Sequence, residues 1–307
     1  MKRSAIPALS LALPFCLALL TGCASHDSTG RGPVTASGAP EPPTGGATPG
    51  RADYTYRLPI AAYSYSDAEY EVIESAQQVM ARDCMRNFGL PYRPPGKSAP
   101  AAISDRRYGL SDMDDANRYG YRLPPQPPEP EPKLTADQKK VLYGSRSREI
   151  PGEKNGRLEY RGKAVPDTGC LGSSIKKFAE PYAYPAGVTA ASNISTDSYK
   201  DSMRDSDIKS LFTRWSACMK EKGYDYASPM DPFRTPAFTQ GEVTEKERKT
   251  AAADVTCKRS TNLLESWLDT ETRIQKGMIR KHTKVLQRLK ELHREKVEAA
   301  RKLTGGA

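Results

Sequence analysis

One cysteine near the N-terminus has the sequence context of a thiol that becomes covalently lipidated. Leu20-Thr21-Gly22-Cys23 closes an apolar run that begins at Ala5 and follows the basic residues Lys2 and Arg3. The run is too short to span a bilayer as a mature helix, but it fits the apolar region of a secretory signal. Lipid-modifying enzymes need a thiol at the new N-terminus. We therefore expect residues 1–22 to be removed and Cys23 to be acylated, which anchors the chain on the extracytoplasmic face of the cell membrane.

The remaining cysteines predict disulfides. Outside the signal and Cys23, the chain contains Cys84, Cys170, Cys218 and Cys257. An even number of thiols outside the cytoplasm indicates two disulfides, for which three pairings exist. Zinc is the alternative, but the chain has no CxxC motif and its histidines, at positions 26, 282 and 293, lie far from these cysteines in sequence. We expect neither a metal nor another cofactor.

Two serine–lysine pairs have a spacing that can support nucleophilic catalysis: Ser173 with Lys176, and Ser206 with Lys209. In penicillin-recognising enzymes, a lysine three residues after a helical serine activates its hydroxyl. Such a pair needs only two residue identities, and neither the later Lys-Thr-Gly element nor the α/β pattern of those enzymes is present. We therefore expect no catalysis at these serines.

Three aspartates, Asp112, Asp114 and Asp115, could provide paired carboxylates for acid–base chemistry. They lie in a polar stretch, for which a solvated turn is the simpler interpretation. Histidines occur only in the N-terminal and C-terminal segments, so a Ser/His or Cys/His site has no evident place to assemble. The sequence predicts a protein that is not an enzyme.

The positive charge of the chain is concentrated near its C-terminus. Residues 273–303 contain 11 Lys or Arg and three Glu, whereas the rest of the mature chain balances 34 basic with 34 acidic side chains. We expect Lys281, Lys284, Arg288 and Arg294 to bind anionic lipid headgroups or an anionic envelope polymer, or else an envelope protein. A soluble helix with a charged exterior is the alternative interpretation, and nucleic acid is not an expected partner of a surface lipoprotein.

These residues must be positioned by helices, the first of which is predicted to begin at Ser66. Ser66 and Glu69 have the spacing of a capping box, in which each side chain binds the other residue's backbone N–H. Apolar residues between Val72 and Phe88 recur at intervals of three and four, and Gly89 is suited to end the helix.

The same design recurs later in the chain. A second helix is predicted to have its N-cap at Ser206 or Asp207 and to end at Gly223. The segments Cys84–Tyr92 and Cys218–Tyr226 share Cys, Met, a basic residue, Gly and Tyr at identical offsets. We interpret them as an internal duplication.

The duplication favours one pairing of the cysteines. Each repeated cysteine is followed by one further cysteine, which favours Cys84 with Cys170 and Cys218 with Cys257, although interleaved pairing is also compatible with the sequence. Closing each loop would stabilise the fold by on the order of 4 kcal/mol.

A long helical region is predicted from Thr244 to Leu303. Thr244 and Glu247 form another capping box, and the region contains no proline and a single glycine, Gly277, where we expect a break. The apolar stripe after Gly277 is narrow, so we expect the last part to pack lightly or to project from the body.

The stretch between Tyr92 and Cys170 is expected to be mostly irregular. One short capped helix is predicted at Thr135–Tyr143, ended by Gly144. The proline-rich segment Pro124–Pro132 favours a stiff polyproline II spacer over a binding motif.

The predicted fold class is mainly α, with two related helical units, long irregular loops, two disulfides and a long basic C-terminal helix. The expected organisation is a signal peptide at 1–22, a disordered Gly/Pro/Ser tether at 23–52, a first unit at 53–185, a second unit at 186–272 and the basic extension at 273–307.

Taken together, these motifs resemble uncharacterised lipoproteins of actinobacteria. The likeness rests on the lipidation signal, the tether, the duplicated Cys-Met-base-x-x-Gly-x-x-Tyr turns, and the pairs Tyr108-Gly109, Tyr119-Gly120 and Gly169-Cys170. The resemblance implies an extracytoplasmic, mostly helical, disulfide-linked protein, and it implies no particular activity.

The expected function is non-enzymatic binding or interaction at the cell envelope by a membrane-anchored lipoprotein. The alternative is a solute-binding lipoprotein with a ligand cleft between the two helical units. Several tyrosines could line such a cleft: Tyr54, Tyr56, Tyr63, Tyr65, Tyr119 and Tyr121.

Overall fold

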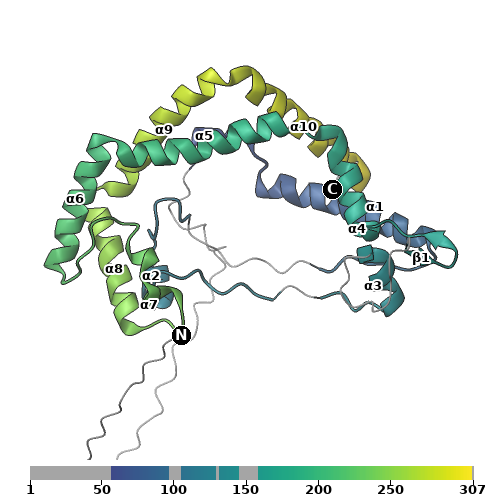
Figure 1. Cartoon of the computed structure of the whole chain (residues 1–307), viewed down its shortest axis with the longest axis horizontal. Helices are drawn as coiled ribbons and strands as arrows, with labels where there is room; N and C mark the ends of the chain where they lie inside the picture. Colours follow the sequence, from purple (N-terminus) through teal and green to yellow (C-terminus); the bar gives the residue numbers. More distant parts are fainter. Residues whose placement is uncertain (1–56, 97–104, 129–130, 145–157, 306–307) are drawn as a thin grey trace, which may run out of the picture. The chain divides into compact units, whose positions relative to one another are not determined.

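The structure, a computed structural model, describes residues 57–96, 105–128, 131–144 and 158–305, which are mainly helical (Figure 1). The predicted signal, Cys23, the tether, Tyr54 and Tyr56 lie outside the described residues. The helices are α1 (Asp67–Asn87), α2 (Met113–Tyr119), α3 (Ala136–Tyr143), α4 (Gly169–Ala179), α5 (Pro185–Arg204), α6 (Ser206–Glu221), α7 (Pro236–Thr239), α8 (Glu245–Ser260), α9 (Leu263–Lys281) and α10 (Thr283–Thr304). Short 3-10 turns lie at η1 (Pro59–Tyr63), η3 (Glu180–Tyr182) and η4 (Pro232–Arg234), and strands β1 (Glu159–Tyr160) and β2 (Lys163–Ala164) form an antiparallel hairpin.

One of the two predicted capping boxes is present in full, and a further box forms at the start of the capped helix predicted from Thr135. At the start of α1, Ser66 Oγ accepts a hydrogen bond from Glu69 N, and the Glu69 carboxylate accepts one from Ser66 N at 2.8 Å. At the start of α3, Thr135 and Gln138 make the equivalent pair of bonds. Because each box satisfies backbone N–H groups that a helix leaves unpaired, it fixes where the helix begins.

The duplicated turns have the same backbone geometry. Gly89 and Gly223 adopt positive φ angles of 71° and 87°. Leu90 N donates to Met85 O at 3.1 Å, and Tyr224 N donates to Met219 O at 2.9 Å. Both helices therefore end in the same left-handed glycine turn, as predicted.

The two disulfides have the favoured pairing. Cys84–Cys170 joins α1 to α4 with a Cα–Cα distance of 5.6 Å, and Cys218–Cys257 joins α6 to α8 at 5.7 Å. The methionine that follows each duplicated cysteine, Met85 or Met219, is fully buried. Each repeated helix end therefore anchors a disulfide at the edge of a packed core.

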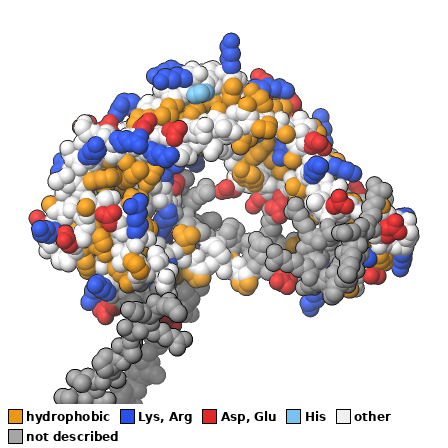
Figure 2. Space-filling model, in the orientation of Figure 1, with side chains coloured by type: hydrophobic (Ala, Val, Ile, Leu, Met, Phe, Trp, Pro, Cys, Tyr) orange, Lys and Arg blue, Asp and Glu red, His pale blue; other side chains and the backbone are white. Residues whose placement is uncertain are grey.

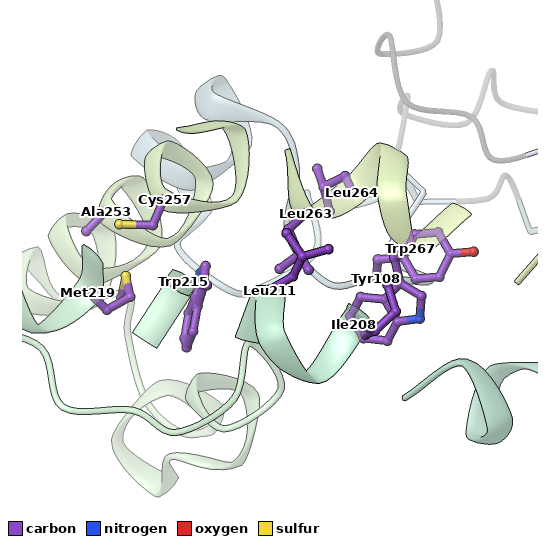
Figure 3. Packing of buried hydrophobic residues seen from close by; sticks show 10 residues of the cluster. All are labelled: Tyr108, Ile208, Leu211, Trp215, Met219, Ala253, Cys257, Leu263, Leu264 and Trp267. Carbon is purple, nitrogen blue, oxygen red and sulfur yellow. The ribbon is translucent and has the colours of Figure 1, made fainter. Parts of the chain in front are cut away.

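The largest core cluster surrounds two tryptophans. It combines α6, α8 and α9 with Tyr108, whose ring stacks on Trp267 at a centroid distance of 4.9 Å (Figure 3). Its members are Tyr108, Ile208, Leu211, Trp215, Met219, Ala253, Cys257, Leu263, Leu264 and Trp267. Tyr108 lies within the predicted first unit and both tryptophans within the second, so this core joins residues from both.

The long C-terminal helical region is interrupted, but not at Gly277, where a break was predicted. Gly277 lies inside α9, and the breaks fall at Thr261–Asn262 and at His282. Asn262 adopts a left-handed conformation with φ of 52°, which asparagine tolerates better than most residues. A single glycine costs a helix only about 1 kcal/mol. Helix α9 continues through Gly277, and Met278 and Ile279 just after it are half-buried against a core cluster.

The prediction that the last helix packs lightly or projects from the body was wrong. Helix α10 contacts α1 and α5, and it buries one continuous face. The buried residues of this face are Leu286, Leu289, Leu292, Val297 and Ala300. Buried positions three to five residues apart give a wider stripe than the seven-residue repeat suggested.

Three local features differ from the predictions or add to them. The interval between Tyr92 and Cys170 also contains α2, whose N-cap is Asp112, and the β1–β2 hairpin. The N-cap of α6 is Asp205, whose side chain accepts a hydrogen bond from Asp207 N at 3.0 Å. At Thr244 only half of the capping box forms, because the Glu247 side chain turns inward to other partners.

Candidate functional site

The most basic exposed surface lies where α9 meets α10. The chain turns at His282, with His282 N bonded to Ile279 O at 3.0 Å and Leu286 N bonded to His282 O at 3.0 Å. Four exposed cations surround this turn, and we call them the basic corner: Lys276, Arg280, Lys281 and Lys284. Figure 2 shows Lys and Arg side chains projecting from this segment.

The basic corner has no acidic residue near it in sequence. Residues 273–290 contain seven Lys or Arg and no Asp or Glu. At the edges of this stretch, Arg273 pairs with Asp205 at 3.0 Å and Arg288 with Glu291 at 3.3 Å. In the described part of the chain, no ion pair involves a cation of the basic corner. These charges are therefore available to an anion from outside.

The helix termini at the turn have opposite electrostatic effects. Arg280 and Lys281 lie in the last turn of α9, where cations complement the negative end of the helix dipole. Lys284 lies in the first turn of α10, which has no acidic residue and no side-chain cap. A cation at this positive helix end is unfavourable for folding, and an approaching anion would relieve the repulsion.

The four predicted cations are all exposed but fall into different environments. Lys281 and Lys284 belong to the basic corner. Arg288 is engaged by Glu291 and, at 3.8 Å, by Glu295. Arg294 lies six residues further along α10 and lines a groove. The prediction had not distinguished these roles, and it had omitted Lys276 and Arg280, although both lie in the same acid-free stretch.

The groove runs between η1, the start of α1 and one face of α10, with a volume of about 1150 Å³. Its walls combine the small apolar residues of η1 with the side chains of Tyr65, Lys290, His293 and Arg294. In helix α10, Lys290 and Arg294 are four residues apart and therefore share a face.

An aromatic pair forms part of the groove wall. The rings of Tyr65 and His293 stack with centroids 4.0 Å apart, and Lys296 Nζ lies 5.6 Å from the Tyr65 centroid. Burial raises the pKa of Tyr65 to about 12. Burial, reinforced by the charge of Lys296, lowers the pKa of His293, whose Nδ1 is buried without a hydrogen-bond partner among the described residues. The neutral imidazole is therefore the favoured form.

The tyrosines do not gather around one cleft. Tyr65 lines the groove, and Lys290 Nζ lies 6.0 Å from the ring of Tyr63. Tyr121 is instead buried in a separate cluster, where it stacks on Phe238 at 5.5 Å. The described tyrosines thus serve different parts of the structure.

The residues considered for catalysis are not arranged for it. Ser173 lies on α4 and Ser206 at the start of α6, while Lys176 and Lys209 are exposed. Within the described ranges, no hydrogen bond joins either serine to its lysine.

The aspartates form a helix start rather than a solvated turn. Asp112 caps α2 by accepting a hydrogen bond from Asp115 N at 2.8 Å, and Asp115 pairs with Arg106 at 3.0 Å. Asp114, in the first turn of α2, is exposed. Asp112 and Asp115 are therefore accounted for by capping and by a structural ion pair.

Sequence inspection did not predict a buried polar network centred on Glu271. Its carboxylate, fully buried, accepts hydrogen bonds from Arg107 Nε at 2.9 Å, Tyr108 Oη at 2.7 Å and Ser198 Oγ at 2.7 Å. Gln275 Nε2 adds a bond at 3.2 Å. Burial alone would raise the pKa of Glu271, but these bonds, with that from Arg107 first, lower it. The network ties α9 to α5 and is structural, because its carboxylate is inaccessible.

Neither a metal site nor a membrane span is found in the described ranges. No group of three His, Cys, Asp or Glu side chains there could hold a metal ion, and no described helix is long and apolar enough to cross a bilayer.

No family model, curated protein or solved structure matches the chain. The chain's own residues are therefore the basis for a functional hypothesis.

Proposed function

We propose that this chain is an extracytoplasmic lipoprotein, anchored through Cys23, whose basic corner binds an anionic component of the cell envelope. The observation that carries the proposal is the group of four exposed cations at the α9–α10 turn without an acidic partner. The lipidation signal and the resemblance to actinobacterial lipoproteins support the location.

The physical basis is electrostatic attraction at short range. Each Lys or Arg close to an anionic membrane surface contributes roughly 1 kcal/mol to binding, and the attraction decays within about 8 Å at physiological salt. Four cations on one turn therefore supply a contact that salt would weaken. Anionic headgroups and anionic wall polymers share this chemistry.

The test uses the mature chain with Cys23→Ser, so that the lipid does not contribute to binding. Deleting residues 273–303 would remove the buried face of α10, so point substitutions are preferable. One variant changes the basic corner to glutamine at Lys276, Arg280, Lys281 and Lys284. The matched control removes four exposed cations of α6 and its C-cap in the same way, at Lys209, Arg214, Lys220 and Lys222. Both variants have the same net charge.

Co-sedimentation would be measured with phosphatidylglycerol vesicles and with isolated cell walls at increasing salt. We expect the wild type and the control to bind and to dissociate as salt rises, and the basic-corner variant to bind on the order of a hundredfold more weakly. Equal weakening in the control would mean that net charge alone is responsible. That result, or no binding by the wild type, would contradict the proposal.

A further inference from the structure

The groove beside α10 differs from the basic corner because it combines unengaged cations with an apolar wall. Its lining cations are Arg57, Lys290 and Arg294. No ion pair holds any of the three among the described residues, although Lys290 lies over the ring of Tyr63. These side chains can therefore turn toward a ligand without breaking a salt bridge.

Two of the acidic residues in the lining are already committed to partners. Glu69 accepts the hydrogen bond of Ser66 N in the capping box, and this bond leads the effects that lower its pKa. Glu291 pairs with Arg288 at 3.3 Å. The third acidic residue, Asp67, lies in the first turn of α1, where the helix dipole favours a carboxylate. The charges left for a ligand are thus predominantly positive.

The opposite wall of the groove is apolar. It consists of Pro59, Ala61 and Ala62 from η1 with Leu58, the N-cap of η1, and is continued by the ring of Tyr65. Ala61 and Ala62 are exposed, so their side chains meet solvent when the groove is empty. Covering such a wall with a hydrocarbon chain is favourable by about 25 cal/mol for each Å² removed from water.

From this arrangement we propose that the groove binds a single-chain amphipathic anion. Its acidic headgroup interacts with Lys290 and Arg294, and its hydrocarbon chain lies along η1 and Tyr65. The volume of about 1150 Å³ is larger than a small inorganic ion needs and leaves room for a headgroup together with a hydrocarbon chain. The combination of a cationic pair with an apolar wall is what selects a lipid-like anion over a small inorganic ion.

The first test compares three probes with one soluble protein, the mature chain carrying Cys23→Ser. The probes are lysophosphatidylglycerol below its micelle concentration, lysophosphatidylcholine of the same chain length, and glycerol 3-phosphate. Binding would be followed by calorimetry and by the NMR signals of the His293 ring, assigned by their loss in His293→Gln. We expect lysophosphatidylglycerol to bind with 1:1 stoichiometry, to shift these signals and to bind at least about tenfold more tightly than either other probe.

The second test separates this site from the basic corner. The double variant Lys290→Gln and Arg294→Gln should bind lysophosphatidylglycerol at least about tenfold more weakly. The matched double variant Lys281→Gln and Lys284→Gln, with the same loss of charge, should bind it as the wild type does. Circular dichroism and melting curves establish that both variants are folded.

Several results would overturn the proposal. If lysophosphatidylcholine bound as tightly as lysophosphatidylglycerol, the charge of the headgroup would not select the ligand. If glycerol 3-phosphate bound as tightly, the apolar wall would not contribute to selection. Equal weakening in the two double variants, or no binding by the wild type, would exclude a specific site in the groove. Because the groove does not include the basic corner, failure of the vesicle and cell-wall test would contradict the envelope proposal and leave this one intact.

Discussion

The Nζ atom of Lys258 lies 2.9 Å from Oδ2 of Asp254, and both side chains are fully buried one turn apart on α8. Lys258 also donates to Leu110 O at 2.9 Å, and Asp254 Oδ1 accepts a hydrogen bond from Trp215 Nε1 at 2.9 Å. The pair thus connects α8 with α6 and with the segment before α2. Burial raises the pKa of Asp254 and lowers that of Lys258, so each charge depends on the other.

Breaking this pair should destabilise the protein more than replacing it. Asp254→Ala leaves a buried ammonium group without its counterion, and we expect the free energy of unfolding to fall by about 3–5 kcal/mol. The double variant Asp254→Leu and Lys258→Met removes both charges and should cost less than the single change. Urea unfolding at pH 7 measures both. A double variant less stable than Asp254→Ala would contradict this account.

The ion pair of Glu271 with Arg107 should make stability depend on pH in the acidic range. The pKa of folded Glu271 lies below its ordinary value of 4.5, so its contribution is present above that value and is lost as pH falls through the lower folded pKa. Glu271→Gln should therefore cost about 3 kcal/mol at pH 7, and the difference from the wild type should shrink below pH 4.5. Denaturant unfolding at several pH values measures this. A difference that does not change with pH would show that the carboxylate charge is unimportant.

The stacked pair of His293 and Tyr65 should produce a second pH dependence, nearer neutrality. The folded pKa of His293 is lowered from 6.5, so folding favours the neutral ring and stability is lost as pH falls below 6.5 toward the folded pKa. The slope should not exceed about 1.4 kcal/mol per pH unit. His293→Gln should remove this loss between pH 7.5 and pH 5, whereas the control His282→Gln, at an exposed histidine, should retain it. Identical profiles of His293→Gln and the wild type would contradict the prediction.

Two glycines with positive φ should respond differently to alanine. Gly223 has φ of 87° and open space around the position of a Cβ atom, so Gly223→Ala should cost only the backbone strain, roughly 1–2 kcal/mol. At Gly144, with φ of 65°, a Cβ atom would lie 2.4 Å from Gly169 N, so the backbone of α4 would have to move. We expect Gly144→Ala to be the more destabilising change in thermal unfolding. A ranking in the opposite order would mean that the α3–α4 contact is loose.

Much of the helical framework could be predicted because it depends on neighbouring residues. The capping box at Ser66 and the glycine turns at Gly89 and Gly223 are formed by groups within a few positions of one another. The favoured disulfide pairing followed from repetition of a local motif. The basic character of the C-terminal region could also be predicted from the sequence, because residues 273–290 contain no acidic residue.

The tertiary structure decided the features that depend on distant partners. Glu247 has the spacing of a capping residue, yet its carboxylate binds Arg122, 125 positions away, and this pairing overrides the local one. The turn at His282 and the buried face of α10 likewise follow from packing on α5 and α1 rather than from the helix propensity of the chain. The groove exists only because η1 lies opposite α10, which begins 220 residues after η1 ends. Local geometry is encoded within a few residues, whereas burial and long-range ion pairs depend on which surfaces meet when the chain folds.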